Sequence, residues 1–198
     1  MFKEKCKRII KDFLGLLFFN NLKVLAHIYK TDKRGHDYLE NYQRHFSSLR
    51  FARINLLEIG IGGYDDPKAG GNSLRMWKKF FPFGRVHGID IVDKSALAER
   101  RIQIHQGSQT DLSFLETMIG KVLPVTIIID DGSHVSKDVI TTFKFLFPKL
   151  RKRGMVCRGR HSNFLLEGIR RRPQRPCQSS HLHELFQANY GLRQFIRI

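Results

Sequence analysis

Short apolar runs alternate with amphipathic stretches through the middle of the chain. Four runs have the length and composition of buried strands, at residues 54–59, 85–91, 102–105 and 125–130. Three stretches with helical spacing of apolar residues lie between and after them, at residues 73–81, 112–121 and 136–150. This alternation predicts an α/β fold with a Rossmann-like, doubly wound parallel sheet. In such a sheet, ligands bind at the carboxyl ends of the strands.

The N-terminal part of the chain has a different pattern. Residues 1–30 predict one or two amphipathic helices, because five large apolar residues fall at helical spacing with Lys and Arg on the other face: Ile9, Ile10, Phe13, Leu16 and Leu17. Such a helix packs on the edge of a domain, or it contacts a membrane surface or a partner. Residues 29–36 are polar, and a further helix is expected up to about Leu49. We therefore assign residues 1–50 to an N-terminal helical segment.

Composition and charge narrow the class of protein. The chain has 198 residues, which suffices for one domain with a sizeable core. Its net charge of +17 is typical of proteins that bind nucleic acid or anionic membranes, so a basic nucleic-acid-binding protein is one alternative hypothesis. The three cysteines are scattered without metal-ligand spacing, and no apolar run is long enough to cross a bilayer. A cytoplasmic location is the simplest expectation.

The basic charge has two sources. Residues 1–155 hold 27 basic and 16 acidic side chains, whereas residues 156–198 hold 8 basic and 2 acidic side chains. All eight basic residues after position 155 are arginine, and no aspartate occurs there. This change in composition indicates that the two parts of the chain differ in origin.

A glycine-rich loop follows the first predicted strand. Gly60, Gly62 and Gly63 let the backbone turn sharply and approach a ligand closely, although Asp65 stands where the third glycine of G-x-G-x-x-G would be. Asp90 ends the second predicted strand about thirty residues later, where an acidic residue accepts hydrogen bonds from ribose hydroxyls. The pattern favours a nucleoside-containing cofactor. An NAD-binding Rossmann protein is a second alternative, disfavoured by the incomplete glycine pattern.

Five motifs together resemble one family, the metal-dependent sugar O-methyltransferases of macrolide biosynthesis (the mycinamicin and tylosin type). The motifs are Leu57-Glu-Ile-Gly-Ile-Gly-Gly, Gly70-Gly-Asn-Ser-Leu-Arg-Met-Trp, His87-Gly-Ile-Asp-Ile-Val-Asp-Lys, Gln106-Gly-Ser-Gln-Thr-Asp and Ile129-Asp-Asp-Gly-Ser-His. Tyr29-Lys-Thr-Asp-Lys also resembles the start of the family pattern. The resemblance covers residues 28–155. It implies a class I methyltransferase fold with S-adenosylmethionine and Mg²⁺ as cofactors and a hydroxyl of a sugar-bearing small molecule as acceptor.

The resemblance also implies a role for each residue of the site. Glu58, Gly60 and Gly62 would line the methionine and ribose part of the cofactor, and Asp90 would hold the ribose. Ser108 and Gln109 would lie near the adenine, and Asp130 would bound the pocket at the end of the fourth strand. Asp131 would be a magnesium ligand and His134 the general base. This chemistry is reasonable, since a divalent cation stabilises an alkoxide and a histidine can accept its proton.

The resemblance stops after Met155. The family continues with a fifth strand that bears a Glu-Asp pair, whereas this chain has no carboxylate between Met155 and Glu167. Degenerate codons for residues 156–167, read one nucleotide later, can encode Tyr-Val-Glu-Asp-Val-Thr-Gln-Thr-Ser-Tyr-Trp-Lys, which is close to the missing segment. We therefore hypothesise that the chain is frameshifted from about Val156. The alternative is a divergent relative with a different C-terminal half.

The frame hypothesis leads to expectations for the rest of the fold. Residues 51–155 would form an S-adenosylmethionine-binding half-domain with an incomplete sheet that contains only the first four strands. Residues 156–198 would form a disordered or loosely helical tail without a strand paired to residues 125–130. The chain itself would be inactive, because Asp131 alone is a poor magnesium site. The sequence predicts no specific nucleic-acid partner and leaves a homo-oligomer open.

Overall fold

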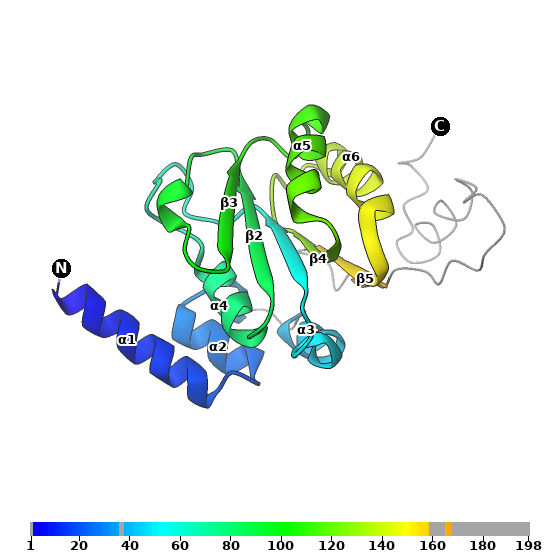
Figure 1. Cartoon of the computed structure of the whole chain (residues 1–198). Helices are drawn as coiled ribbons and strands as arrows, with labels where there is room; N and C mark the ends of the chain where they lie inside the picture. The colour runs from blue at the N-terminus through cyan, green and yellow to red at the C-terminus, as the bar shows by residue number, and fades with distance from the viewer. Residues whose placement is uncertain (1, 36–37, 159–164, 168–198) are drawn as a thin grey trace.

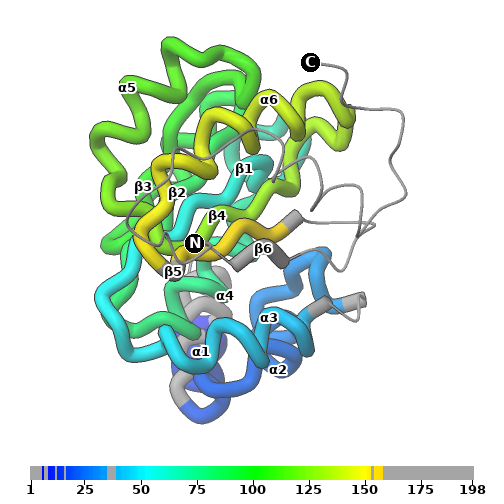
Figure 2. The backbone as a smooth tube through the Cα atoms, turned by 90° about the vertical axis from the view of Figure 1, so that its right-hand side faces the viewer, coloured from blue at the N-terminus to red at the C-terminus, as the bar shows by residue number. Residues whose placement is uncertain are grey.

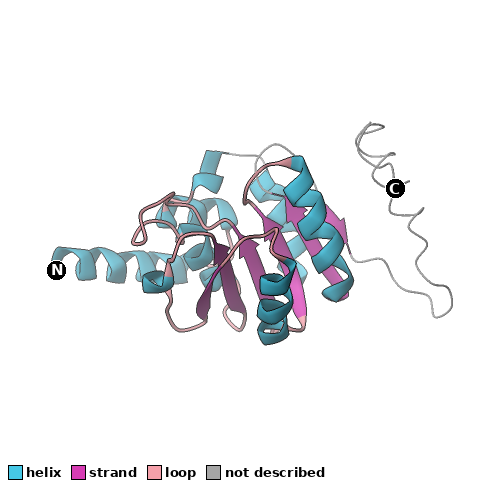
Figure 3. Cartoon of the chain, turned by 90° about the horizontal axis from the view of Figure 1, so that it is seen from above, coloured by secondary structure: helices cyan, strands magenta, loops and turns pink. Residues whose placement is uncertain are grey.

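In the computed structural model, described for residues 2–35, 38–158 and 165–167, the chain forms a six-stranded sheet with helices on both faces (Figures 1 and 3). The strand order is β3-β2-β1-β4-β5-β6. The strands are β1 (Asn55–Ile59), β2 (Arg85–Asp90), β3 (Ile102–Gln106), β4 (Val125–Asp130), β5 (Leu150–Arg158) and β6 (Leu165–Glu167). The first five are parallel and β6 is antiparallel to β5. This is the predicted Rossmann-like fold.

Within the described ranges, six α-helices connect and cover the strands. They are α1 (Phe2–Leu17), α2 (Leu22–Tyr29), α3 (Tyr38–Phe46), α4 (Asn72–Phe80), α5 (Leu112–Val122) and α6 (Ser136–Leu146). Short 3₁₀ turns occur at Asp32–Gly35, Ser47–Leu49, Ser95–Leu97 and Phe147–Lys149. The helices α2, α3 and α4 lie on one face of the sheet, and α5 and α6 lie on the other (Figure 2). No helix in the described part of the chain is long and apolar enough to cross a membrane.

The N-terminal helical segment shares its core with the sheet. Trp77 of α4 is fully buried, and its ring packs edge-on against Tyr42 and Phe46 of α3 at centroid distances of 5.7 and 5.9 Å. Leu25 of α2 and Leu56 of β1 belong to the same apolar cluster. Burial of aromatic rings of this size dominates the energetics of such a core. The segment is therefore built onto the sheet and, together with α4, forms one of its two covering layers.

The structure corrects the expectation that the sheet ends at β4. Strand β5 pairs with β4 in parallel, with Ile127 opposite Met155 and Ile129 opposite Cys157. Met155, Val156 and Cys157 are all buried. The buried and largely apolar β4 would otherwise expose its hydrogen-bonding edge, and β5 covers that edge with three consecutive apolar residues at its centre.

The strand pairing therefore needs apolar character at residues 155–157 and no family motif. The expected boundary between positions 155 and 156 falls inside β5. Disorder was also expected for the residues after position 155. Of these, the structure describes residues 156–158 and β6, and the others lie outside the described part of the chain.

Candidate functional site

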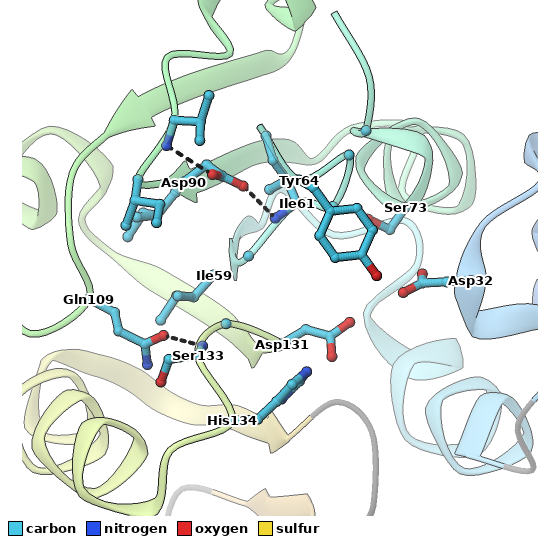
Figure 4. Close-up of a pocket in the computed structure, with 18 of the residues that line it drawn as sticks. Asp32, Ile59, Ile61, Tyr64, Ser73, Asp90, Gln109, Asp131, Ser133 and His134 are labelled. Atoms are coloured by element: carbon cyan, nitrogen blue, oxygen red, sulfur yellow. Dashed lines mark hydrogen bonds between the residues drawn. The ribbon is translucent and has the colours of Figure 1, made fainter. Parts of the chain in front are cut away.

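A pocket of about 690 Å³ opens at the carboxyl ends of the parallel strands. The loops after β1, β2, β3 and β4 line it, together with residues of the 30–33 segment that follows α2 (Figure 4). Of the predicted site residues, seven line the pocket: Gly60, Gly62, Asp90, Ser108, Gln109, Asp131 and His134. The tertiary structure thus brings together predicted residues that lie between positions 60 and 134 of the sequence.

The glycine loop forms the pocket wall through conformations that favour glycine. Gly60 has φ +75°, and a Cβ atom there would lie 2.3 Å from the backbone oxygen of Asp131. Gly62 has φ +71° and no atom within 4 Å of its would-be Cβ. Both residues therefore need positive φ, and Gly60 in addition lets the β1 and β4 loops touch.

Asp90 is held by the loop that it faces. Its carboxylate accepts a hydrogen bond from the backbone N–H of Ile61 at 3.3 Å and another from that of Val92 at 3.0 Å, both drawn in Figure 4. These bonds fix the side chain between the β1 and β2 loops. A carboxylate has about four acceptor sites, so two backbone bonds leave capacity for the hydroxyl groups of a ligand.

Gln109 organises the loop after β4. Its Oε1 atom accepts a hydrogen bond from the backbone N–H of Ser133 at 2.8 Å, and its Nε2 atom donates to Thr142 Oγ1 at 3.1 Å. The same amide group lies 3.4 Å from Asp130 Oδ2. Asp130 is buried beneath the pocket and does not line it. Gln109 thus fixes the backbone that carries Asp131 and His134.

A buried lysine connects the N-terminal segment to two strand ends. Lys33 Nζ lies 2.6 Å from Asp131 Oδ2 and 2.9 Å from Glu58 Oε1, and the side chains of Lys33 and Glu58 are almost fully buried. Burial by itself would lower the pKa of Lys33, but the carboxylates of Glu58 and Asp131 raise it above its ordinary value. Lys33 therefore remains an ammonium ion.

Glu58 lies below the pocket and is not part of its lining. Its Oε2 atom accepts a hydrogen bond from the indole N–H of Trp77 at 3.0 Å. Burial raises the pKa of the Glu58 carboxyl group, and the Lys33 ammonium opposes that shift. Glu58 thus supports the pocket wall through its contact with Lys33, which lines the pocket.

Lys94 supports the opposite rim. This fully buried lysine donates from Nζ to three backbone carbonyl groups, those of Tyr64 at 2.8 Å, Asp66 at 2.9 Å and Ala69 at 3.1 Å. The loop that follows the glycines is therefore tied to the loop after β2. Sequence reasoning gave no role to Lys33 or Lys94. Both lysines end a motif that carries the family resemblance, Tyr29-Lys-Thr-Asp-Lys for Lys33 and His87-Gly-Ile-Asp-Ile-Val-Asp-Lys for Lys94, and these motifs are the sequence feature that points to them.

Asp131 and His134 lie on the same wall of the pocket (Figure 4). Asp131 Oδ1 is buried and makes no hydrogen bond, while its Oδ2 atom binds Lys33. His134 is exposed and takes φ +59°, an unusual conformation for a non-glycine residue. Strained backbone of this kind is frequent at functional sites. The pair thus combines an acceptor oxygen without a partner and an imidazole that a ligand can reach.

The described residues do not form a magnesium site. Across residues 2–35, 38–158 and 165–167, no group of three or more His, Cys, Asp or Glu side chains could hold a metal ion. Asp131 offers one free oxygen, and the ammonium of Lys33 occupies the other. Mg²⁺ requires octahedral oxygen coordination and usually more than one carboxylate. Asp131 alone does not fit this requirement.

The fold and the position of the pocket define a Rossmann-like methyltransferase fold. The described chain superposes on a solved methyltransferase, MycE from the mycinamycin biosynthetic pathway in complex with Mg, SAH and mycinamycin VI. The TM-score is 0.67 at 46% identity, and the match covers 69% of this chain and 38% of that one.

Comparison of amino-acid sequences shows which proteins this chain is related to. The chain is 46% identical over 137 residues to mycinamicin VI 2''-O-methyltransferase of Micromonospora griseorubida and 44% identical over 137 residues to demethylmacrocin O-methyltransferase of Streptomyces fradiae. Each match covers 68% of this chain but only 34% and 35% of the relative. No protein-family model matches. Over two thirds of its length, this chain is related to the S-adenosylmethionine-dependent sugar O-methyltransferases, and it spans about a third of their length.

Proposed function

We propose that the pocket binds S-adenosylmethionine and that the chain is the cofactor-binding part of an O-methyltransferase. The acceptor we propose is a hydroxyl group of a sugar or of a sugar-bearing metabolite. Support comes from the relatives, two of which are named as O-methyltransferases of mycinamicin VI and of demethylmacrocin. A related structure contains SAH, the product that S-adenosylmethionine leaves after methyl transfer, together with Mg and mycinamycin VI.

The charge of the pocket lining carries the proposal for the cofactor. The chain as a whole has a net charge of +17, yet five aspartates and only two lysines line the pocket. The aspartates are Asp32, Asp65, Asp90, Asp131 and Asp138, and the lysines are Lys30 and Lys33. An acidic lining favours the sulfonium cation of S-adenosylmethionine and disfavours the pyrophosphate of NAD or a nucleic-acid backbone. The acidic lining therefore favours S-adenosylmethionine over NAD and over nucleic acid as the ligand.

Asp90 would bind the ribose of the cofactor. Its carboxylate is fixed by the backbone N–H groups of Ile61 and Val92 and faces the pocket. Vicinal ribose hydroxyl groups are good donors to such a fixed carboxylate at the end of the second strand. Gly60 and Gly62 would let the methionine part lie close to the backbone.

His134 would act as the general base. In the proposed reaction the acceptor oxygen forms a bond to the methyl carbon, the sulfur–methyl bond breaks, and the hydroxyl proton passes to the imidazole. An imidazole is a common general base in enzymes. Because the described residues do not complete a magnesium site, no step here depends on the metal. Asp131 remains a predicted ligand whose companions are absent from the described residues.

Isothermal titration calorimetry of the full chain tests the cofactor proposal. We expect a saturable signal with S-adenosylmethionine and with S-adenosylhomocysteine, and a weaker or absent signal with NAD⁺. Tighter binding of NAD⁺ by a folded preparation would overturn the proposal. The circular dichroism spectrum of the same sample establishes that the preparation is folded.

A further inference from the structure

Helix α1 presents a continuous apolar stripe to solvent. Six large apolar side chains on or directly after the helix are between 37% and 67% exposed: Ile9, Ile10, Phe13, Leu14, Leu17 and Phe18. They form two series with a spacing of four residues, which places them on one face of a helix. Monomeric soluble proteins rarely expose contiguous apolar patches of this kind, and such patches mark interaction sites.

The opposite side of α1 rests on the protein. A Cβ atom at Gly15 would lie 2.8 Å from Lys79 Cε and 2.9 Å from the Tyr29 hydroxyl oxygen. Gly15 is two positions from both Phe13 and Leu17, about 200° around the helix axis. The helix is therefore seated through its glycine side, and its apolar side points away from the described protein. The N-terminal end of α1 also extends beyond the remaining elements (Figures 1 and 3).

The charge of α1 and of the whole chain indicates which kind of surface covers this apolar stripe. The α1 segment contains five basic residues, Lys3, Lys5, Lys7, Arg8 and Lys11, and two acidic residues, Glu4 and Asp12. The whole chain carries +17. A second copy would bring an equally positive surface to the stripe, which opposes self-association. An anionic lipid surface offers both complementary charge and an apolar layer, the combination that binds basic amphipathic helices.

We propose that α1 is a membrane-surface helix that docks the protein on anionic lipid bilayers. The helix lies in the plane of the interface, with Phe13 and Leu17 inserted among the acyl chains, and the net positive charge of the segment favours the anionic head groups. This arrangement needs no membrane-spanning segment, in keeping with the absence of one in the described part of the chain. The inference is independent of the cofactor pocket, which lies at the carboxyl ends of the strands.

Vesicle sedimentation tests the proposal with the full chain. We expect co-sedimentation with vesicles of phosphatidylcholine and phosphatidylserine, and much less with phosphatidylcholine alone. The double variant Phe13→Ser, Leu17→Ser keeps the net charge and removes two apolar side chains that are 61% and 60% exposed. It should lower the partition coefficient by about tenfold or more, because each buried side chain of this size contributes substantially.

The matched control is Leu112→Ser, Leu123→Ser. These side chains are 47% and 49% exposed and lie at the two ends of α5, on the opposite face of the sheet from α2 and α4, so this variant should partition like the unchanged chain. Both variants should keep the thermal unfolding midpoint, since exposed side chains are changed. Three results would overturn the proposal: absence of sedimentation, equal loss in both double variants, or a dimer in solution that Phe13→Ser, Leu17→Ser dissociates.

Discussion

The ammonium group of Lys33 lies 2.6 Å from the Oδ2 atom of Asp131, although the two residues are 98 positions apart. The same ammonium contacts Glu58, so one cation of the N-terminal segment joins the ends of β1 and β4. The contact leaves Asp131 Oδ1 without a partner. Lys33 thus fixes the orientation of a carboxylate in the pocket while it compensates two buried negative charges.

Replacing Lys33 with methionine should destabilise the protein strongly. The change leaves Glu58 and Asp131 without their cation, and breaking a buried ion pair in this way costs about 3–5 kcal/mol. Urea unfolding measures the free energy. Lys23→Met is the matched control, because Lys23 pairs with Glu40 where both side chains are at least 60% exposed, and it should cost less than about 1 kcal/mol. Similar losses in the two variants would show that the buried contact does not stabilise the fold.

Asp90→Ala should weaken S-adenosylmethionine binding by about tenfold or more, since two lost charge-assisted hydrogen bonds correspond to a few kcal/mol. Calorimetry gives the dissociation constant. The matched control is Asp93→Ala. This change removes a carboxylate that accepts a hydrogen bond from the backbone N–H of Ser95 and lies outside the pocket lining, so the affinity of this variant for S-adenosylmethionine should stay unchanged. Unchanged affinity of Asp90→Ala for S-adenosylmethionine would contradict the proposal that Asp90 binds the ribose.

The chain as it stands should show little or no Mg²⁺-dependent methyl transfer, because the described residues supply one free carboxylate oxygen at Asp131. A chain with the proposed one-nucleotide shift corrected should regain the Glu-Asp pair and the activity. In that corrected chain, His134→Ala should lower the rate by about 10²–10⁴-fold. The transfer of labelled methyl groups to a sugar-bearing macrolide measures the activity of the chain as it stands, of the corrected chain and of its His134→Ala variant. Strong activity of the uncorrected chain would contradict the frame hypothesis.

A pair of histidines should make stability dependent on pH. His87 Nδ1 lies 3.3 Å from His105 Nε2, and burial lowers the pKa of His87 to about 4 from 6.5. Burial also lowers the pKa of His105. The unfolded chain therefore binds protons that the folded chain does not bind between about pH 6.5 and pH 4, so stability falls as the pH falls through this window.

The loss attributable to His87 is on the order of 3 kcal/mol across the window. Urea unfolding at several pH values measures it, and His87→Phe should flatten the profile. His27 is exposed on α2, so His27→Phe should leave the profile as it is. An equally steep profile in His87→Phe would assign the acid sensitivity to other groups.

The sequence by itself determined the order of strands and helices around the site. Buried parallel strands require apolar runs and the turns between them require glycine, so residues 54–63 and 125–130 were recognisable locally. Asp90 ends the second strand, and Asp131 and His134, whose roles the family resemblance implied, follow the fourth; the carboxyl ends of parallel strands meet at one edge. Their presence in one pocket needed no knowledge of packing beyond the fold class.

Only the tertiary structure decided which side chains support that pocket. Lys33, Glu58 and Asp131 come from three distant parts of the chain, and nothing in local pattern shows which buried charges will meet. The same holds for β5, whose Met155 and Cys157 pair with β4 although the family resemblance ends at that point. Strand pairing depends on apolar character and backbone hydrogen bonds, which many sequences satisfy, whereas an ion pair depends on the exact packing of the elements that carry it.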